Sequence, residues 1–349
     1  MYSQKLVAYG QRLKAWNGET PAPRGGEVLV RVRNAGVCHS DVHLQDGYFD
    51  LGGGERLDIA SGRALPFTLG HEVEGEVAAL GPDARGVRLG ERVVVYPWIG
   101  CDGCALCARG DGHLCAKPRQ IGVTIDGGYA DHCLVPDAKY LFPYGAVEPA
   151  LAATYACSGI TAYGALAKAG GAAGDGPVLI VGLGGVGMAA LSFARALYKT
   201  APLVADIDPA KREAALAAGA GAAFDPADKG AAKAVRAATG GGVSAALDFV
   251  GADSSFAFAS AALGRHGTLV VVGLLGGRMT LPLAMFPLKG ITVTGSYVGS
   301  LGQFRAMMAL VRDGRVAPIP IQTRPLADAS RTLDDLRAGR VLGRAVLVP

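Results

Sequence analysis

The chain has 349 residues, of which 50% are hydrophobic, and a formal net charge of +4. This length corresponds to about two domains, and the apolar content is sufficient for two cores. The small charge, with no cluster of lysine or arginine, argues against a nucleic-acid or membrane surface and favours a small-molecule substrate. The N-terminus lacks the apolar core of a signal peptide, and no apolar run reaches the ~18 residues of a membrane span, so we expect a cytoplasmic protein.

Up to about residue 150, the sequence predicts an irregular antiparallel β domain. Segments rich in valine and aromatic residues, such as 27–32 and 92–96, alternate there with Gly and Pro turns. Residues 130–135 also predict a strand. Its thiol, Cys133, is expected to be packed in the core and to take no part in chemistry.

Four cysteines lie close together in this part of the chain, at Cys101, Cys104, Cys107 and Cys115. They supply four soft sulfur ligands at loop spacing, which is typical of a closed, structural zinc site. An iron–sulfur cluster is the alternative. The bacterial ferredoxin pattern, however, places its fourth cysteine four positions after the third, and here the fourth follows eight positions later. Reduced cysteines that bind a metal agree with a cytoplasmic location.

A second set of metal-binding residue types lies outside this cluster: Cys38, the pair His71 and Glu72, and Cys157. These side chains could form a three-ligand zinc site with one position open to water or substrate, which is typical of catalytic zinc. A lone cysteine is ordinarily a small apolar core residue, so Cys157 is predicted as a ligand only because Cys38 and His71 accompany it. Two zinc ions of different character indicate an enzyme.

After about residue 150, apolar strand-like runs alternate with alanine-rich helical stretches. This alternation predicts a doubly wound α/β domain with a parallel sheet. The predicted strands are 178–182, 203–206, 245–250 and 268–274, and the predicted helices are 185–198, 209–218 and 254–263. From about Tyr297 the pattern becomes mixed again, so we expect the C-terminal segment, including the closing run 344–348, to pack back onto the first domain.

A glycine-rich sequence, residues 182–187, follows the first of these strands and opens the next helix. In this strand–turn–helix context the G-x-G-x-x-G pattern predicts a dinucleotide site, with Asp206 at the end of the following strand. Gly182 makes the tight turn, Gly184 lets the pyrophosphate approach, and Gly187 lets the helix pack on the strand. The helix N-terminus, at Gly185 and Val186, offers free N–H groups to the phosphates.

Asp206 also indicates which dinucleotide is bound. Its carboxylate would accept hydrogen bonds from the adenosine ribose and repel a 2′-phosphate, so NAD is favoured over NADP. The alternative is a glycine-rich turn followed by a solvated aspartate, which the strand–turn–helix context argues against.

Taken in order, these segments resemble the zinc-dependent medium-chain alcohol dehydrogenases. The resemblance runs over nearly the whole chain, from Cys38 to Arg344. It implies a GroES-like β-barrel catalytic domain at 1–157 and 298–349, with a zinc lobe at about 99–117. A Rossmann NAD-binding domain is inserted between the two parts, at 158–297, and the active site lies in the cleft between the domains.

The resemblance also implies roles for individual residues. Cys38, His71 and Cys157 would bind the catalytic zinc, with Glu72 as an exchanging ligand. Asp41 would accept a hydrogen bond from the ligand histidine, Ser40 would hydrogen-bond the substrate oxygen, and His43 would pass the proton outward. The coenzyme contacts are expected from Thr161 beside the nicotinamide, from Lys211, and from His39 and Arg344 at the pyrophosphate.

Two departures from the family pattern are informative. Histidine at position 39 replaces the arginine of some relatives, so we expect weaker pyrophosphate binding and faster release of NADH. The segment 45–64 is longer than usual and is expected to form an extended loop at the cleft mouth. Tyr48, Phe49 and Trp98, with Leu274 and Leu275 opposite, are then predicted substrate-wall residues; packing without substrate contact is the alternative.

The expected activity is reversible hydride transfer between NAD and a medium-sized apolar or aromatic alcohol, primary or secondary. Two alternatives stay open: a metal-independent NAD(P)H enone reductase of the same fold, and a non-catalytic protein that binds zinc and nucleotide. The expected cofactors are two zinc ions per chain and NAD. We expect a homotetramer, with a dimer as the alternative, joined through the Rossmann sheet edge, for which 290–298 is the predicted strand.

Overall fold

The structure is a computed structural model that describes residues 1–61 and 63–349, apart from the side chains of 171–175. One half of the molecule is built on a seven-stranded sheet in the order β10-β8-β7-β3-β18-β17, with β9 paired to β3, and on a small sheet in the order β2-β1-β6. The strands are β1 Tyr2–Leu6, β2 Lys14–Asn17, β3 Val28–Gly36, β6 Phe67–Thr68, β7 Glu72–Leu80, β8 Arg92–Val95, β9 His132–Val135, β10 Leu141–Phe142, β17 Ile321–Pro325 and β18 Arg344–Val348. This confirms the predicted antiparallel β domain.

Strand β3 shows why this half folds as a sheet with one buried face. Val28, Val30 and Val32 are buried, and Arg31 and Arg33 on the opposite face are exposed, although Leu29 on that face is buried as well. Side chains of a strand alternate between its two faces, so this pattern places the valines in the core. β3 is also the strand against which β7, β9 and β18 all pair.

The other half is the predicted doubly wound domain, with six parallel strands in the order β13-β12-β11-β14-β15-β16. The strands are β11 Val178–Val181, β12 Leu203–Ala205, β13 Ala222–Phe224, β14 Val243–Asp248, β15 Leu263–Val271 and β16 Thr292–Gly295; the helices are α4 Ile160–Asp175, α5 Gly185–Leu197, α6 Pro209–Ala217, α7 Ala231–Ala238, α8 Asp253–Ala262 and α9 Met285–Lys289. Four of these elements, β13, α4, α7 and α9, were not predicted. The expected edge strand is β16, at one end of the sheet.

Two separate cores confirm that helices cover both faces of this sheet. Ile180 of β11 belongs to the large apolar cluster that includes Met188 of α5. Leu179 and Val181, which point to the other face, belong to a second cluster with Phe258 of α8. All four side chains of β11 are buried, which explains why this strand reads as a continuous apolar run.

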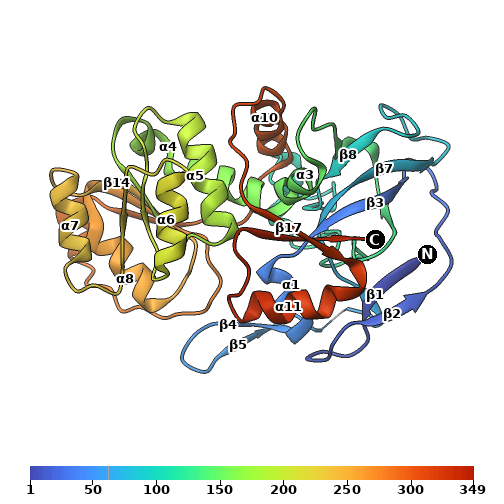
Figure 1. Cartoon of the computed structure of the whole chain (residues 1–349), viewed down its shortest axis with the longest axis horizontal. Helices are drawn as coiled ribbons and strands as arrows, with labels where there is room; N and C mark the ends of the chain where they lie inside the picture. The colour runs from blue at the N-terminus through green and yellow to red at the C-terminus, as the bar shows by residue number, and fades with distance from the viewer. Residues whose placement is uncertain (62) are drawn as a thin grey trace.

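The C-terminal segment returns to the first half of the molecule, as predicted. β18 pairs antiparallel with β3 through Val346 opposite Gly36 and Leu347 opposite Ala35. Helices α10 Leu301–Arg312 and α11 Ala329–Arg337 flank this return, and Figure 1 shows the red C-terminal strands beside the blue N-terminal ones. The domain boundaries near residues 157 and 297 stay a prediction.

A long helical rod links the two halves. It consists of α3 Pro149–Thr154, the π-helical turn η3 Tyr155–Gly159, and α4. By length and composition alone, its segment Pro149–Gly170 could cross a membrane, and 83% of its most apolar stretch is buried inside the fold. Burial of that kind is typical of a core helix. The sequence analysis did not predict a helix of this length, which arises because α3, η3 and α4 follow one another directly.

The segment 45–64 differs from the extended loop that the sequence predicts. Helix α1 His39–Asp46 ends at Gly47, and a β hairpin follows, formed by β4 Tyr48–Asp50 and β5 Arg56–Asp58. The hairpin reaches the half built on the parallel sheet, where Glu55 forms an ion pair with Arg278. Figure 1 shows it extending from below α1 toward α8. The segment therefore contains two paired strands where the sequence predicts an extended loop.

Candidate metal and coenzyme site

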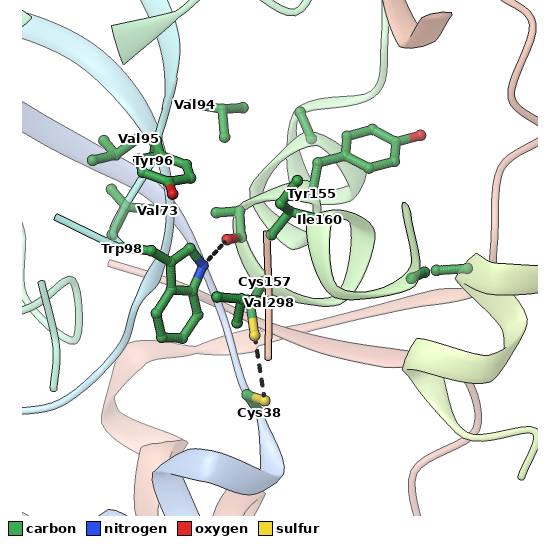
Figure 2. Close-up of a cluster of buried hydrophobic side chains, with 14 of the residues drawn as sticks. Cys38, Val73, Val94, Val95, Tyr96, Trp98, Tyr155, Cys157, Ile160 and Val298 are labelled. Atoms are coloured by element: carbon green, nitrogen blue, oxygen red, sulfur yellow. Dashed lines mark hydrogen bonds between the residues drawn. The ribbon is translucent and has the colours of Figure 1, made fainter. Parts of the chain in front are cut away.

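The four residues of the second donor set come from three separate parts of the chain and meet in the core. Cys38 lies between β3 and α1, His71 and Glu72 lie at the start of β7, and Cys157 lies in η3. One ligand atom from each lies within 4.8 Å of every other, and all four side chains are buried. Figure 2 shows the sulfur atoms of Cys38 and Cys157 pointing toward each other.

The spacing and the unpaired atoms of this group fit a tetrahedral zinc ion. Sulfur ligands that lie ~2.3 Å from a tetrahedral zinc are about 3.8 Å from each other, and the Cys38 and Cys157 Sγ atoms are 3.8 Å apart. His71 Nε2 and Glu72 Oε2 are buried without a hydrogen-bond partner among the described residues. Buried polar atoms rarely lack partners, so these atoms indicate a ligand that completes the site.

Asp41 orients the histidine of this group. One of its carboxylate oxygens accepts hydrogen bonds from the Cys38 N–H at 3.0 Å and the Tyr129 hydroxyl at 2.8 Å. The other oxygen lies 3.2 Å from His71 Nδ1. Burial alone would lower the pKa of His71, but the Asp41 carboxylate raises that pKa well above its usual value. This contact at Nδ1 leaves Nε2 as the ring nitrogen available to the other residues of the group.

The two thiols respond to each other. The Cys157 thiol hydrogen-bonds the Cys38 sulfur, and this bond lowers the pKa of Cys38 well below its usual value, although burial opposes the shift. The same bond, followed by burial, raises the pKa of Cys157 well above its usual value. A bound Zn²⁺ would require both thiols as thiolates.

One of the two carboxylate oxygens of Glu72 is engaged in other contacts. Its Oε1 accepts a hydrogen bond from the Ser158 N–H at 3.3 Å and forms a buried ion pair with Arg344. Burial raises the pKa of Glu72 to about 7, and Arg344 partly offsets that rise. Arg344 also packs against Gly185 at the N-terminus of α5, where a Cβ atom would lie 2.1 Å from the arginine Cδ. Arg344 therefore lies beside the glycine-rich turn, and its contact with the pyrophosphate stays a prediction.

The four-cysteine lobe forms a second, separate sulfur cluster. Cys101, Cys104, Cys107 and Cys115 each place a sulfur within 4.8 Å of the others. The Cys104 sulfur is 3.5 Å from that of Cys107 and 3.8 Å from that of Cys115, close to the edge of a zinc–sulfur tetrahedron. A disulfide would place two sulfurs at ~2.05 Å. The lobe thus fits a single ion held by four thiolates.

The glycine-rich turn has the local geometry predicted for a dinucleotide site. Gly182 has a φ of 89°, which favours glycine. A Cβ atom on Gly184 would meet nothing within 4 Å, so the turn is open on the side of the coenzyme. A Cβ atom on Gly187 would lie 1.8 Å from the Gly182 carbonyl oxygen. The helix therefore packs against the turn more closely than a residue with a side chain would allow. Val186 lies in the first turn of α5.

Asp206 lies just past the end of β12 and faces this turn. Its carboxylate accepts hydrogen bonds from the backbone N–H groups of Leu183 at 2.7 Å and Asp208 at 2.9 Å. His39 lies across the cleft at the start of α1. Partial burial, and then the charges of Arg344 and Lys211, lower the pKa of His39. His39 and Arg344, the two residues predicted at the pyrophosphate, therefore lie close enough for the charge of one to affect the pKa of the other.

An apolar cavity of about 880 Å³ opens beside the donor set. Of the predicted substrate-wall residues, Phe49, Trp98 and Leu274 line it. Tyr48 and Leu275 do not. Tyr48 points to the opposite face of β4, where Arg56 stacks on its ring at 4.0 Å, and Leu275 is exposed on the surface.

Several cavity residues were not predicted from the sequence. Leu44 lies one helical turn after Ser40 in α1, and Leu57 lies opposite Phe49 in the hairpin. Tyr297 and Met279 enter from the coenzyme-binding half. Helical spacing from Ser40 was the available signal for Leu44, and recognition of the hairpin would have identified Leu57.

Ser40 and His43 lie on one face of α1, three positions apart. Ser40 lines the cavity, and its Oγ is 3.7 Å from the Cys38 sulfur. His43 is half-buried and packs on Phe49, with ring centroids 4.8 Å apart. Thr161 is buried in the first turn of α4. Ser40 is thus the hydroxyl placed between the thiolates and the cavity.

These features define a two-domain dehydrogenase with metal and nucleotide sites, and comparison with known proteins agrees. Residues 24–145 match the family model described as alcohol dehydrogenase GroES-like domain, and residues 185–313 match that described as zinc-binding dehydrogenase. The NAD-dependent alcohol dehydrogenases of Sulfurisphaera tokodaii and Saccharolobus solfataricus are each 34% identical to this chain, with 100% of both chains covered. The crystal structure of the alcohol dehydrogenase from Aeropyrum pernix is similar with a TM-score of 0.89 and 29% identity, again with 100% of both chains covered. The chain belongs to the zinc-dependent medium-chain alcohol dehydrogenase family, which confirms the predicted fold class.

The metal content of single cysteine variants tests the two donor sets. We expect two zinc ions per chain in the unchanged protein and one in Cys38→Ser, because the second site loses a thiolate ligand. Cys133→Ser is the control, since Cys133 is buried outside both groups. Elemental analysis of purified protein measures the ratio. Two zinc ions retained in Cys38→Ser would show that this cysteine is not a ligand.

Proposed function

We propose that this chain is an NAD-dependent alcohol dehydrogenase that acts reversibly on medium-sized apolar or aromatic alcohols, primary or secondary. The observation that carries the proposal is the position of Ser40 between two clustered thiols and a cavity walled mainly by apolar side chains. Relatives named as NAD-dependent alcohol dehydrogenases over their full length support the same reaction. We further propose one zinc ion at each donor set.

The residues of the site would hold and activate the substrate as follows. When bound, zinc acts as a Lewis acid on the substrate oxygen and NAD accepts the hydride. Cys38, His71 and Cys157 would hold the metal beside the cavity. The substrate hydroxyl would give its proton to Ser40 Oγ while the Ser40 hydroxyl releases its own proton. Burial lowers the pKa of His43, which favours the neutral imidazole that can accept the released proton.

The two alternative functions lack a specific observation in their favour. A metal-independent enone reductase would not need two groups of clustered thiols. A non-catalytic protein that binds zinc and nucleotide would have no use for a hydroxyl placed between the thiols and an apolar cavity. Absence of zinc from the purified protein would favour the enone reductase. Absence of NAD reduction with any alcohol would favour the non-catalytic protein.

A panel of alcohols and the matching carbonyl compounds, assayed by NADH absorbance in both directions, tests the proposed reaction. We expect Ser40→Ala to lower kcat at least ~100-fold at unchanged zinc content, because the proton acceptor is lost while the ligands remain. Ser260→Ala, a serine of α8 remote from the donor set, is the control. Absence of NADH formation with every alcohol, in protein that contains both zinc ions, would contradict the proposal.

Coenzyme choice can be tested at Asp206. We expect Asp206→Ser to lower kcat/KM for NAD about tenfold and to raise it for NADP, because the carboxylate that repels a 2′-phosphate is removed. Asp208→Ser is a matched control, since serine can replace the N-cap that Asp208 provides to α6. Equal use of NAD and NADP by the unchanged protein would contradict the assignment of Asp206.

We also propose a cytoplasmic homotetramer, with domains at 1–157 plus 298–349 and at 158–297. Near the edge strand β16, Leu275, Leu283 and Leu288 are exposed by 61%, 79% and 67%. Light scattering should give the mass of four chains, and a charge introduced by Leu283→Glu should lower it. Leu89→Glu, at a leucine 64% exposed in the other half, should not. A monomeric unchanged protein would overturn the assembly.

A further inference from the structure

Trp98 lies between the two metal-binding regions and contacts the segment that carries a catalytic ligand. It follows β8 and precedes the first lobe cysteine, Cys101, by three residues. Its indole Nε1 donates a hydrogen bond of 2.8 Å to the carbonyl oxygen of Ala156, the residue directly before Cys157. Figure 2 shows this bond beside the contact between the Cys157 and Cys38 sulfurs.

The Cys157 segment needs such support because it is not regular α-helix. Cys157 lies in the middle of the π-helical turn between α3 and α4. A π turn holds one more residue than an α turn and is intrinsically less favourable, so its side-chain directions depend on outside contacts. Two further bonds hold the next residue: the Ser158 N–H to Glu72 at 3.3 Å, and the Ser158 hydroxyl to Thr154 at 2.8 Å.

The same indole also packs against the other ligand region. The centroid of its ring system lies 5.3 Å from that of His71 and 5.6 Å from that of Tyr297, with an edge-on geometry for the tyrosine. Trp98 is 2% exposed. One rigid side chain therefore fixes the distance between the turn of Cys157 and the ring of His71.

The backbone of Trp98 is fixed in turn by the base of the lobe. The Ile99 carbonyl accepts a hydrogen bond from the Arg119 N–H at 2.9 Å, and the Pro97 carbonyl accepts one from the Ile121 N–H at 3.1 Å. Residues 119 and 121 directly follow the lobe, whose last cysteine is Cys115. Residues that follow the lobe therefore hydrogen-bond the backbone on both sides of Trp98.

We propose that Trp98 is a positioning residue for Cys157. Its indole N–H holds the π turn in place, so that the Cys157 sulfur stays at ligand distance from Cys38 and His71, and the lobe supports Trp98 from the other side. This role is separate from the wall that Trp98 contributes to the substrate cavity. The inference rests on the proposed zinc site.

The test replaces Trp98 by 3-benzothienylalanine, whose ring has nearly the same shape but carries sulfur in place of the N–H. Zinc release to a chelating dye is followed, and Cys38→Ser identifies the phase that belongs to the catalytic site. We expect this phase to become about fivefold faster, the rate equivalent of one typical hydrogen bond, while release from the lobe stays unchanged. Amide hydrogen exchange of residues 155–160 should become faster as well.

Tyr297→Leu is the matched control, because it removes an aromatic neighbour of Trp98 and leaves the indole bond in place. It should change KM for alcohols without changing zinc release. Unchanged zinc release and unchanged exchange in the benzothienylalanine protein would overturn the positioning role and leave Trp98 as a cavity wall. Absence of the Cys38-dependent phase in the unchanged protein would instead show that the proposed zinc site itself is wrong.

Discussion

The structure depends on the pairing of charges that are buried together at the base of the cleft. The thiolates of Cys38 and Cys157 and the carboxylate of Glu72 would carry three negative charges away from water. Arg344 supplies one positive charge, and a divalent cation would supply the other two. Burial raises the pKa of Glu72, and the hydrogen bond with Cys38, followed by burial, raises the pKa of Cys157, because an uncompensated negative charge is costly here. A bound Zn²⁺ would stabilise the ionised forms of Cys38, Cys157 and Glu72.

The fold brings these charges together from distant positions in the chain. Cys38 lies at the end of β3, the strand on which three others pair, and His71 enters β7 beside it. Cys157 lies in the rod that joins the two halves, so the metal site and the cleft share one structural element. The C-terminal strand β18 supplies Arg344 to Glu72 from one side and to the glycine turn from the other. A single buried arginine therefore contacts both the second donor set and the glycine-rich turn.

The parts of the site that depend on short stretches of sequence could be predicted from local patterns. The glycine spacing at 182–187 and the cysteine spacing at 101–115 each lie within a single turn or loop, so both could be recognised without the fold. The residue types of Cys38, His71 and Cys157 suggested a second zinc site, and the resemblance implied the same ligands; no local spacing indicates that these residues meet. The β4–β5 hairpin was not predicted, since its strands have three residues each and their pairing depends on the turn at Gly52–Gly54. The Trp98 bond and the π turn depend on contacts between distant segments, for which the sequence carries no local signal.

The most direct test of the central claim is a crystal structure of the zinc-loaded protein with anomalous diffraction measured at the zinc edge. The account predicts a peak at about 2.0–2.3 Å from the sulfurs of Cys38 and Cys157 and from His71 Nε2, with a solvent oxygen as the fourth ligand. A site without a peak, or a peak whose fourth ligand is a fixed Glu72 oxygen, would contradict it.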